Sequence, residues 1–408
     1  MERLIITLLA VALATPAFGD EPKPVGDAPV AVFDAKKNIP HASVRIPALL
    51  MTAKGTLIAV AEARDKATDQ AGNDLVVATS RNQGKSWSKP AIAYEQGADS
   101  CNNPCLVQDA KSGRIFLFFQ TFPAGGKEFG GLPVGPADPK GNRLKFVTSD
   151  DEGATWSKAV DVSGDLKPEN AVTCASGPGI GIQLRKGAQA GRLVIPFNSQ
   201  DPKRNFVNWV AFSDDAGKTW RRGAEVPQEG MQLNEVQVAE AADGALYLNS
   251  RRWKGTALRK ASWSTDGGAT WSKAVDDAAL PEPTCQGSLL AATHAGKPAI
   301  FFLNPAGKGR ANGTLRRSDD GGKTWAESTL LFPGAFAYSS MAKVGAEIGV
   351  LYEPNSNTVR KLTNPGQSNA TVSTVAGVAG QFGVAGGCAA RGGLTRRTPH
   401  CACGPDAD

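Results

Sequence analysis

The sequence is poor in the residues that build metal and redox centres. Its 408 residues include three histidines and seven cysteines, with no CxxC pair and no histidine cluster. Zinc sites need such ligands at short spacings, so we expect no metal cofactor. Cys101 and Cys105 are close enough in sequence to form a disulfide. Cys174 and Cys285 lie in apolar segments that predict buried thiols.

A long apolar run of membrane-spanning length is also missing at the N-terminus. The run Leu4–Ala14 follows Arg3 and is too short to cross a bilayer. Together with the cleavage-site pattern Ala17-Phe18-Gly19, it predicts a signal peptide over residues 1–19, the alternative being an ordinary buried segment. We therefore expect a secreted or periplasmic protein with no stable membrane insertion.

No basic stripe interleaved with aromatic residues is present, so we expect no nucleic-acid partner. The net charge of +6 is a mild bias that suits an anionic substrate. No helical periodicity dominates the chain. Instead, 46 glycines and 26 prolines punctuate many short apolar runs, which favours an all-β fold rich in turns.

One octapeptide pattern, Ser-x-Asp-x-Gly-x-Thr-Trp, recurs through the sequence at the scale of one propeller blade. The pattern is physically reasonable as a β-turn. Asp accepts hydrogen bonds from backbone amides of the turn, Gly adopts a positive φ, and the apolar Trp side chain folds back to cover the turn. Asn82 replaces the Asp in the first copy. The five copies are Ser80–Trp87, Ser149–Trp156, Ser213–Trp220, Ser264–Trp271 and Ser318–Trp325.

These octapeptides resemble the Asp-boxes of the sialidase superfamily, which also occur in propellers that are not enzymes. The resemblance implies an all-β, six-bladed β-propeller, which we place at residues 20–385. Residues 370–378 or 381–384 are the candidates for a closing strand. The basic, Gly- and Ala-rich tail at 386–408 is expected to be disordered.

Further segments, from about Val44 to Pro354, resemble the catalytic set of bacterial and animal sialidases, beginning with three arginines that bind the substrate carboxylate. Arg45 opens an Arg-Ile-Pro tripeptide like that of the family, although a surface salt bridge is the alternative for it. Arg251 resembles the second arginine, with Arg252 as its competitor. Arg310 resembles the third, and Arg316 and Arg317 beside the fifth box are expected to face solvent.

The resemblance also assigns the residues of the reaction. Tyr338 resembles the nucleophile, and Glu235 resembles the glutamate that takes its proton, with Glu240 as the alternative. Asp69 occupies the place of the acid/base, with Asp65 and Asp74 as competitors.

Two further residues resemble family positions that support the site. Arg64 resembles a contact to the hydroxyl edge of the sugar. Glu353 resembles the glutamate that orients the first arginine, and a buried structural ion pair is its alternative.

The resemblance therefore implies an exo-α-sialidase that releases terminal sialic acid from glycans with retention, through a tyrosyl intermediate and without an organic cofactor or metal. A trans-sialidase and a non-catalytic sialic-acid-binding propeller are the alternatives. If the assignment is right, Arg45, Arg251 and Arg310 should converge on one pocket. Tyr338 and Glu235 should lie within hydrogen-bond reach at its floor, with Asp69 at its rim.

Overall fold

The computed structural model describes residues 30–353 except 36, 67 and 346, together with 361–362 and 377–379. The expected signal peptide and basic tail lie outside the described residues, as does the strand candidate at 381–384. In the other candidate, at 370–378, the described part belongs to a short strand, β27 (Gly377–Ala379), which pairs in parallel with β1 (Ala31–Asp34).

Six further sheets follow one another along the chain. We number them as blades, each defined by its strands, as follows. Blade 1 holds β2 (Ser43–Met51), β3 (Leu57–Arg64), β4 (Asn73–Ser80) and β5 (Ala91–Tyr94). Blade 2 holds β6 (Ser100–Gln108), β7 (Ile115–Phe122), β8 (Arg143–Ser149), β9 (Val160–Asp161) and β11 (Gly179–Ile180). Blade 3 holds β10 (Thr173–Ser176), β12 (Ile182–Gln183), β13 (Leu193–Gln200), β14 (Phe206–Ser213) and β15 (Arg221–Arg222). Blade 4 holds β16 (Leu233–Glu240), β17 (Leu246–Arg252), β18 (Leu258–Ser264) and β19 (Val275–Pro281); blade 5 holds β20 (Ser288–His294), β21 (Lys297–Pro305), β22 (Ala311–Ser318) and β23 (Glu327–Ala335); blade 6 holds β24 (Ser339–Val344), β25 (Glu347–Tyr352) and β26 (Lys361–Leu362).

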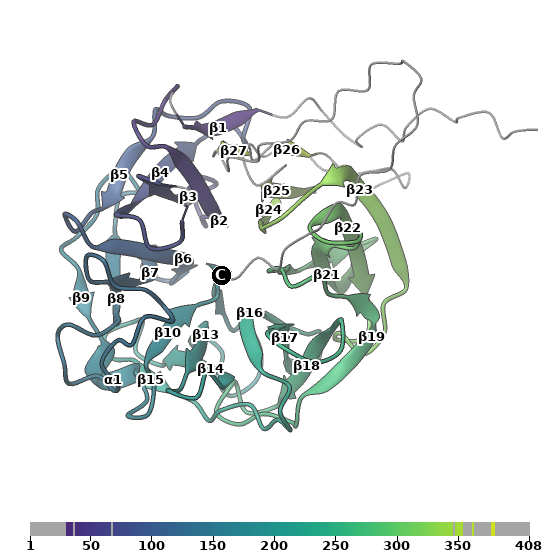
Figure 1. Cartoon of the computed structure of the whole chain (residues 1–408). Coiled ribbons are helices and arrows are strands. Elements are labelled where there is room, and N and C mark those ends of the chain that lie inside the picture. The colour runs from purple at the N-terminus through teal and green to yellow at the C-terminus, as the bar shows by residue number, and fades with distance from the viewer. Residues whose placement is uncertain are drawn as a thin grey trace, which may run out of the picture.

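The blades stand around a central axis, and β2, β6, β16 and β24 lie on the inner side of their blades (Figure 1). β2 contacts both β6 and β24, so the first and last blades meet and close the ring. The predicted propeller class is confirmed. In the described residues five blades have four or five strands and blade 6 has three, so the predicted sixth blade is the incomplete one.

The core lies between the faces of neighbouring blades, because each sheet presents apolar side chains to the next. One cluster joins blades 2 and 3, with Phe118, Phe197 and Trp209 packed together. All four cysteines that the structure describes are free and buried, so Cys101 and Cys105 do not form the disulfide that their spacing allowed, and the buried thiols at Cys174 and Cys285 are confirmed.

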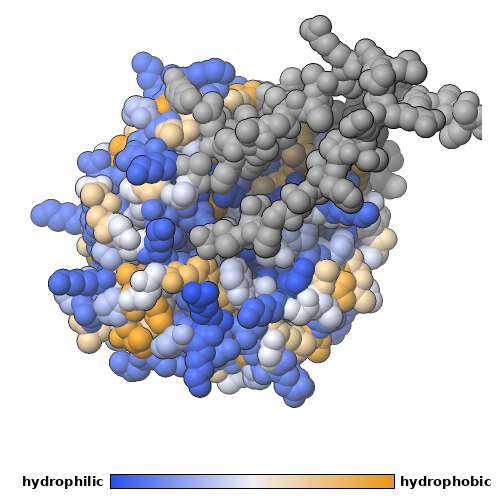
Figure 2. All heavy atoms as spheres, viewed as in Figure 1, coloured by the Kyte–Doolittle hydropathy of each residue, from blue (hydrophilic) through white to orange (hydrophobic). Residues whose placement is uncertain are grey.

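On the face that Figure 2 shows, the surface is largely hydrophilic, and apolar residues form small patches among the hydrophilic ones. Within the described ranges the one helix is α1 (Ser163–Leu166), and none is long and apolar enough to cross a membrane.

Each octapeptide joins two successive outer strands of its blade, as a turn closed by its own side chains. In the third copy, Ser213 Oγ donates to Asp215 Oδ1 at 2.8 Å, and Thr219 donates to Asp215 through its backbone N–H and its hydroxyl at 2.9 and 2.6 Å. Gly217 adopts a φ of 82°, which favours glycine, and an added Cβ would meet Phe116 at 2.1 Å. The turn is therefore a stability element of the fold.

Replacing Asp215 by Ala should lower the free energy of unfolding by about 1 kcal/mol, because three hydrogen bonds lose their acceptor. The Michaelis constant of the folded protein should stay nearly unchanged. Thermal unfolding and substrate kinetics check both parts. A selective loss of substrate affinity would contradict this account, because it would place the turn at the ligand.

Asp215→Asn is the matched control, since Asn82 makes the equivalent bonds in the first copy. Burial raises the pKa of Asp215, but the bonds from Thr219 and Ser213 outweigh it and lower the pKa to about 2. This contribution to stability is therefore complete above the unfolded-state pKa near 3.9 and is lost as the pH falls through about 2. The Asn variant should lack this acid-dependent loss.

Candidate active site

The first strands of blades 1, 2 and 4 carry irregularities near the end where they begin. The register shifts between Arg45 and Ala48 in β2, between Asn102 and Cys105 in β6, and between Leu233 and Val236 in β16. A bulge re-aims side chains and is common next to active sites. Because the strands of a blade alternate in direction, the octapeptide turns lie at the opposite axial end of the blades.

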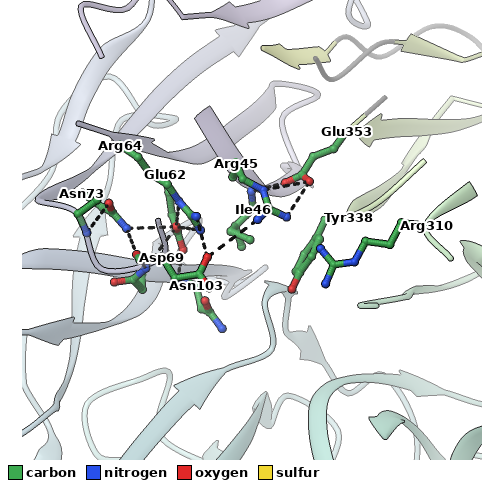
Figure 3. Close-up of polar contacts among 12 residues, drawn as sticks. Arg45, Ile46, Glu62, Arg64, Asp69, Asn73, Asn103, Arg310, Tyr338 and Glu353 are labelled. Carbon is green, nitrogen blue, oxygen red and sulfur yellow. Dashed lines mark hydrogen bonds and ion pairs between the residues drawn. The ribbon is translucent and has the colours of Figure 1, made fainter. Parts of the chain in front are cut away.

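Arg45 is fixed by Glu353, which directly follows β25 of blade 6. Its Nη2 lies 3.0 Å from Glu353 Oε2, and Ile46 N–H donates to Glu353 Oε1 at 2.8 Å. Ile46 has a φ of 58°, a strained conformation for a β-branched residue. Glu353 thus holds both the guanidinium and the bulged backbone, and Figure 3 shows the three residues together.

Tyr338 and Glu235 form a buried pair, although 103 positions separate them in the sequence. Tyr338 Oη donates to Glu235 Oε1 at 2.5 Å. Arg251 Nη1 donates to Glu235 Oε2 at 2.7 Å and to Tyr338 Oη at 3.2 Å. Burial raises the pKa of Tyr338 well above its usual value, and the Glu235 carboxylate adds to this while Arg251 and Arg310 oppose it. The phenol is therefore protonated at neutral pH.

The structure brings the three predicted arginines together around Tyr338. The guanidinium carbons of Arg45 and Arg310 lie 5.1 and 5.4 Å from the centre of its ring, and Arg251 bonds its hydroxyl. Arg310 is the exposed member, bonded to the Thr284 carbonyl at 3.2 Å. The Nε of Arg251 is buried without an acceptor among the described residues, so this group keeps donor capacity for a ligand.

Asp69 lies at the rim of this cluster, in the loop between β3 and β4, with a side chain 56 % exposed. Its Oδ1 accepts from Arg64 Nη1 at 2.7 Å and lies 3.9 Å from Arg45 Nη1. Burial raises the pKa of the Asp69 carboxyl, but Arg64 and Arg45 more than offset it, so the pKa is lowered. Asp69 is therefore ionised in the resting site.

Glu62 is a site residue that the sequence analysis missed. It is fully buried, binds Arg64 Nη2 at 2.6 Å and accepts the Asn103 N–H at 2.7 Å (Figure 3). Glu62 and Arg64 lie two positions apart on one strand and so share a face. A glutamate and an arginine two positions apart in an otherwise apolar strand therefore indicate, from the sequence alone, a buried ion pair.

The competing candidates lie elsewhere. Asp74 bonds His41 at 3.0 Å, and Asp65 lies 3.8 Å from the same ring. Glu240 accepts the backbone N–H groups of two residues in the β12–β13 turn. The competing arginines bond away from Tyr338: Arg252 to Gly255, Arg316 to Asn304 and Arg317 to Asp319. No group of three or more metal-ligating side chains is found within the described ranges.

Comparison with known proteins matches this chain to one family. Residues 55–350 match the BNR repeat-like domain family. The exo-alpha-sialidase of Aspergillus fumigatus is 31 % identical over 339 residues, which cover 76 % of this chain and 78 % of that protein. The chain belongs to the sialidase superfamily. Its Asp-boxes and its arginine, tyrosine and glutamate cluster therefore occur together in a sialidase-type propeller.

Other sialidases are similar in sequence and in structure. The sialidase of Micromonospora viridifaciens is 32 % identical over 384 residues, covering 86 % of this chain, and this chain spans 58 % of that protein's length. The sialidase of Bacteroides fragilis is 30 % identical, and 60 % of it is covered. The Hadza microbial sialidase superposes with a TM-score of 0.71 at 27 % identity, over 79 % of this chain and 65 % of that one.

Proposed function

We propose that this chain is a retaining exo-α-sialidase that removes terminal sialic acid from glycans. The buried Tyr338–Glu235 pair, surrounded by three arginines, is the observation that carries the proposal. A hydroxyl that donates to an adjacent carboxylate is an activated nucleophile. Arginine forks match the planar carboxylate of the sugar and would fix its orientation.

A neutral nucleophile suits a substrate that carries a carboxylate on its anomeric carbon. Two unit charges about 4 Å apart repel by roughly 4 kcal/mol at an effective dielectric constant near 20. An Asp or Glu nucleophile would meet this repulsion, whereas the protonated phenol of Tyr338 does not. The raised pKa of Tyr338 supports the proposal, because the phenol stays neutral until Glu235 accepts its proton.

In the first step Tyr338 Oη attacks the anomeric carbon and passes its proton to Glu235. The bond to the leaving oxygen breaks, its electron pair stays on that oxygen, and Asp69 supplies the proton. In the second step a water molecule attacks the same carbon and gives a proton to Asp69. Tyr338 leaves and recovers its proton from Glu235, so two inversions give net retention.

The test is ¹H NMR of the reaction with 3′-sialyl-lactose in real time. A retaining hydrolase releases the α-anomer of sialic acid first, before it mutarotates in solution. The β-anomer as the first product would contradict the tyrosyl intermediate. Sialyl transfer to an added acceptor, or an anhydro sugar, would identify a trans-sialidase, and absence of any turnover would favour a binding propeller.

We also propose that the protein acts in the periplasm or outside the cell. The apolar run Leu4–Ala14 and the small residues that follow it support export. Expression of the full chain, followed by cell fractionation and N-terminal sequencing, should find a protein that begins near Asp20. A protein that keeps residues 1–19 in the cytoplasm would contradict this.

A further inference from the structure

The segment that joins blade 4 to blade 5 carries two buried polar side chains that the proposed mechanism does not use. It runs from Glu282 to Gln286, between β19 and β20, and both of these residues are 1 % exposed. A buried polar side chain costs free energy unless it is hydrogen-bonded, so its partners show which parts of the molecule it holds. Here the partners are backbone groups close to residues of the pocket.

Gln286 holds the backbone next to the proposed nucleophile at two points. Its Oε1 accepts the Ser339 N–H at 3.0 Å, and its Nε2 donates to the Ser339 carbonyl at 2.9 Å. Ser339 directly follows Tyr338 and begins β24 of blade 6. Two bonds from one side chain fix both the position and the orientation of this backbone. The nucleophile is therefore anchored to the segment between blades 4 and 5.

Glu282 bonds the backbone beside one of the three arginines. Its Oε2 accepts the Arg252 N–H at 2.7 Å, and Arg252 directly follows Arg251 at the end of β17. Its Oε1 accepts the Cys285 N–H at 2.8 Å. One buried carboxylate thus joins the strand end that carries Arg251 to the turn inside the segment itself.

That turn holds a second arginine of the pocket. Thr284 has a φ of 59°, which is uncommon for a β-branched residue and persists only where the surroundings support it. In this conformation the Thr284 carbonyl accepts Arg310 Nη2 at 3.2 Å. The next carbonyl, that of Cys285, accepts the buried Arg259 Nη1 at 2.8 Å. The turn that Glu282 closes therefore supports Arg310.

We propose that residues 282–286 are a positioning segment of the site, in which Gln286 places Tyr338 and Glu282 places Arg251 and Arg310. The inference rests on the proposed function. Tyr338 leads into blade 6, whereas the two arginines belong to blades 4 and 5. A misplacement of about 1 Å between reacting groups can cost about 10²-fold in rate. A segment bonded beside all three keeps them in register across the blades.

The two positioning residues should affect different kinetic constants, which a merely structural role would not produce. Arginines that hold the substrate carboxylate act in the ground state and in the transition state alike, so their misplacement raises KM. A misplaced nucleophile leaves the arginines and the binding intact and lowers kcat. We therefore expect Gln286 variants to change kcat and Glu282 variants to change KM.

The first test is kcat on 3′-sialyl-lactose between pH 5 and pH 8 for Gln286→Met and Gln286→Glu. Met makes neither bond and should lower kcat about tenfold at every pH, with KM within about threefold of the wild type. In the Glu variant the protonated carboxyl group can make both bonds, and burial favours that form. Its kcat relative to the wild type should be near one at pH 5 and should fall as the carboxyl group ionises.

Gln108→Glu is the matched control for this pair. Gln108 accepts the Ala53 N–H at 2.8 Å and donates to the Gly113 carbonyl at 2.9 Å, at the end of β6 opposite to the pocket. Its kcat relative to the wild type should not change with pH. A wild-type kcat in Gln286→Met would overturn the inference, because any effect of the Glu variant would then be one of charge and not of position.

The second test is Glu282→Gln, which should raise KM for sialyl-lactose and Kd for a sialic-acid analogue by about tenfold each, with kcat within about threefold of the wild type. The amide keeps the shape and one acceptor oxygen, so one of the two backbone N–H groups loses its partner. Steady-state kinetics, calorimetric titration and thermal unfolding measure these effects.

Glu240→Gln is the matched control for the second test. Glu240 also accepts two backbone N–H groups, those of Arg185 and Lys186, at the opposite axial end of the blades. It should leave KM and Kd unchanged. Equal losses of kcat and of binding in Gln286→Met and Glu282→Gln would overturn the inference. Where Glu282→Gln does not fold, the Gln286 pair decides by itself.

Hydrogen exchange followed by mass spectrometry separates this inference from the proposed function, because it needs no turnover. Residues 337–340 should exchange faster in Gln286→Met than in the wild type, and residues 250–253 should exchange faster in Glu282→Gln. Equal exchange would overturn the inference even in an active sialidase. Faster exchange in a protein whose wild type shows no turnover would defeat the proposed function and leave the anchoring of the pocket by this segment established.

Discussion

Tyr338→Phe is expected to lower kcat on sialyl-lactose by about 10³-fold or more, the largest effect of any single substitution in this pocket. The change removes the oxygen that would bond the anomeric carbon and leaves the arginines that hold the carboxylate. Binding of a sialic-acid analogue should therefore persist within a fewfold of the wild type. Steady-state kinetics and calorimetric titration measure the two parts separately.

Tyr94→Phe is the matched control, because it removes a hydroxyl that bonds Gln96 away from the pocket. It should keep wild-type kinetics. Activity close to the wild type in Tyr338→Phe would eliminate the tyrosine mechanism for this protein. Loss of analogue binding together with activity would instead show that the hydroxyl is needed to hold Arg251 and Glu235 in place.

Asp69→Ala should lose about 10²–10⁴-fold in kcat/KM on sialyl-lactose and much less on an aryl sialoside. The sugar oxygen of the natural substrate leaves poorly without a proton, whereas an acidic phenol leaves as its anion. Comparing the two substrates at one pH therefore isolates the acid step. Because Arg64 also loses an ion pair, thermal unfolding should be measured alongside.

Asp65→Ala is the control from the same loop, since its carboxylate faces His41 and is 63 % exposed. It should affect neither substrate. Equal losses on both substrates for Asp69→Ala would identify a structural aspartate and would move the acid role to Asp65 or Asp74.

Much of the architecture could be predicted because it depends on interactions between residues that are close together in the sequence. The octapeptide Asp and Gly close their turn with neighbours two to four positions away, so the pattern is readable without tertiary contacts. The number of blades was harder to predict, since blade 6 has no octapeptide turn among the described residues. The sequence left a Cys101–Cys105 disulfide open, and the structure excludes it, because a short sequence separation does not make two side chains face each other in a bulged strand.

The site was predicted less completely than the fold. Tyr338, Glu235 and the arginines followed from a family resemblance, and the structure brings them together. Glu62 was missed although its spacing from Arg64 was visible in the sequence, because only the folded structure shows that both side chains are buried and bonded to each other.

The sequence by itself determined the turns, the strand-length apolar runs and the order of the candidate residues, because each of these depends on interactions within a few residues. The tertiary structure alone decided which charges meet. Arg45 and Glu353 are 308 positions apart and become partners only because blade 6 closes against blade 1. Burial then raises the pKa of Tyr338, and the neighbouring arginines lower the pKa of Asp69, since desolvation and charged neighbours exist only in the folded chain.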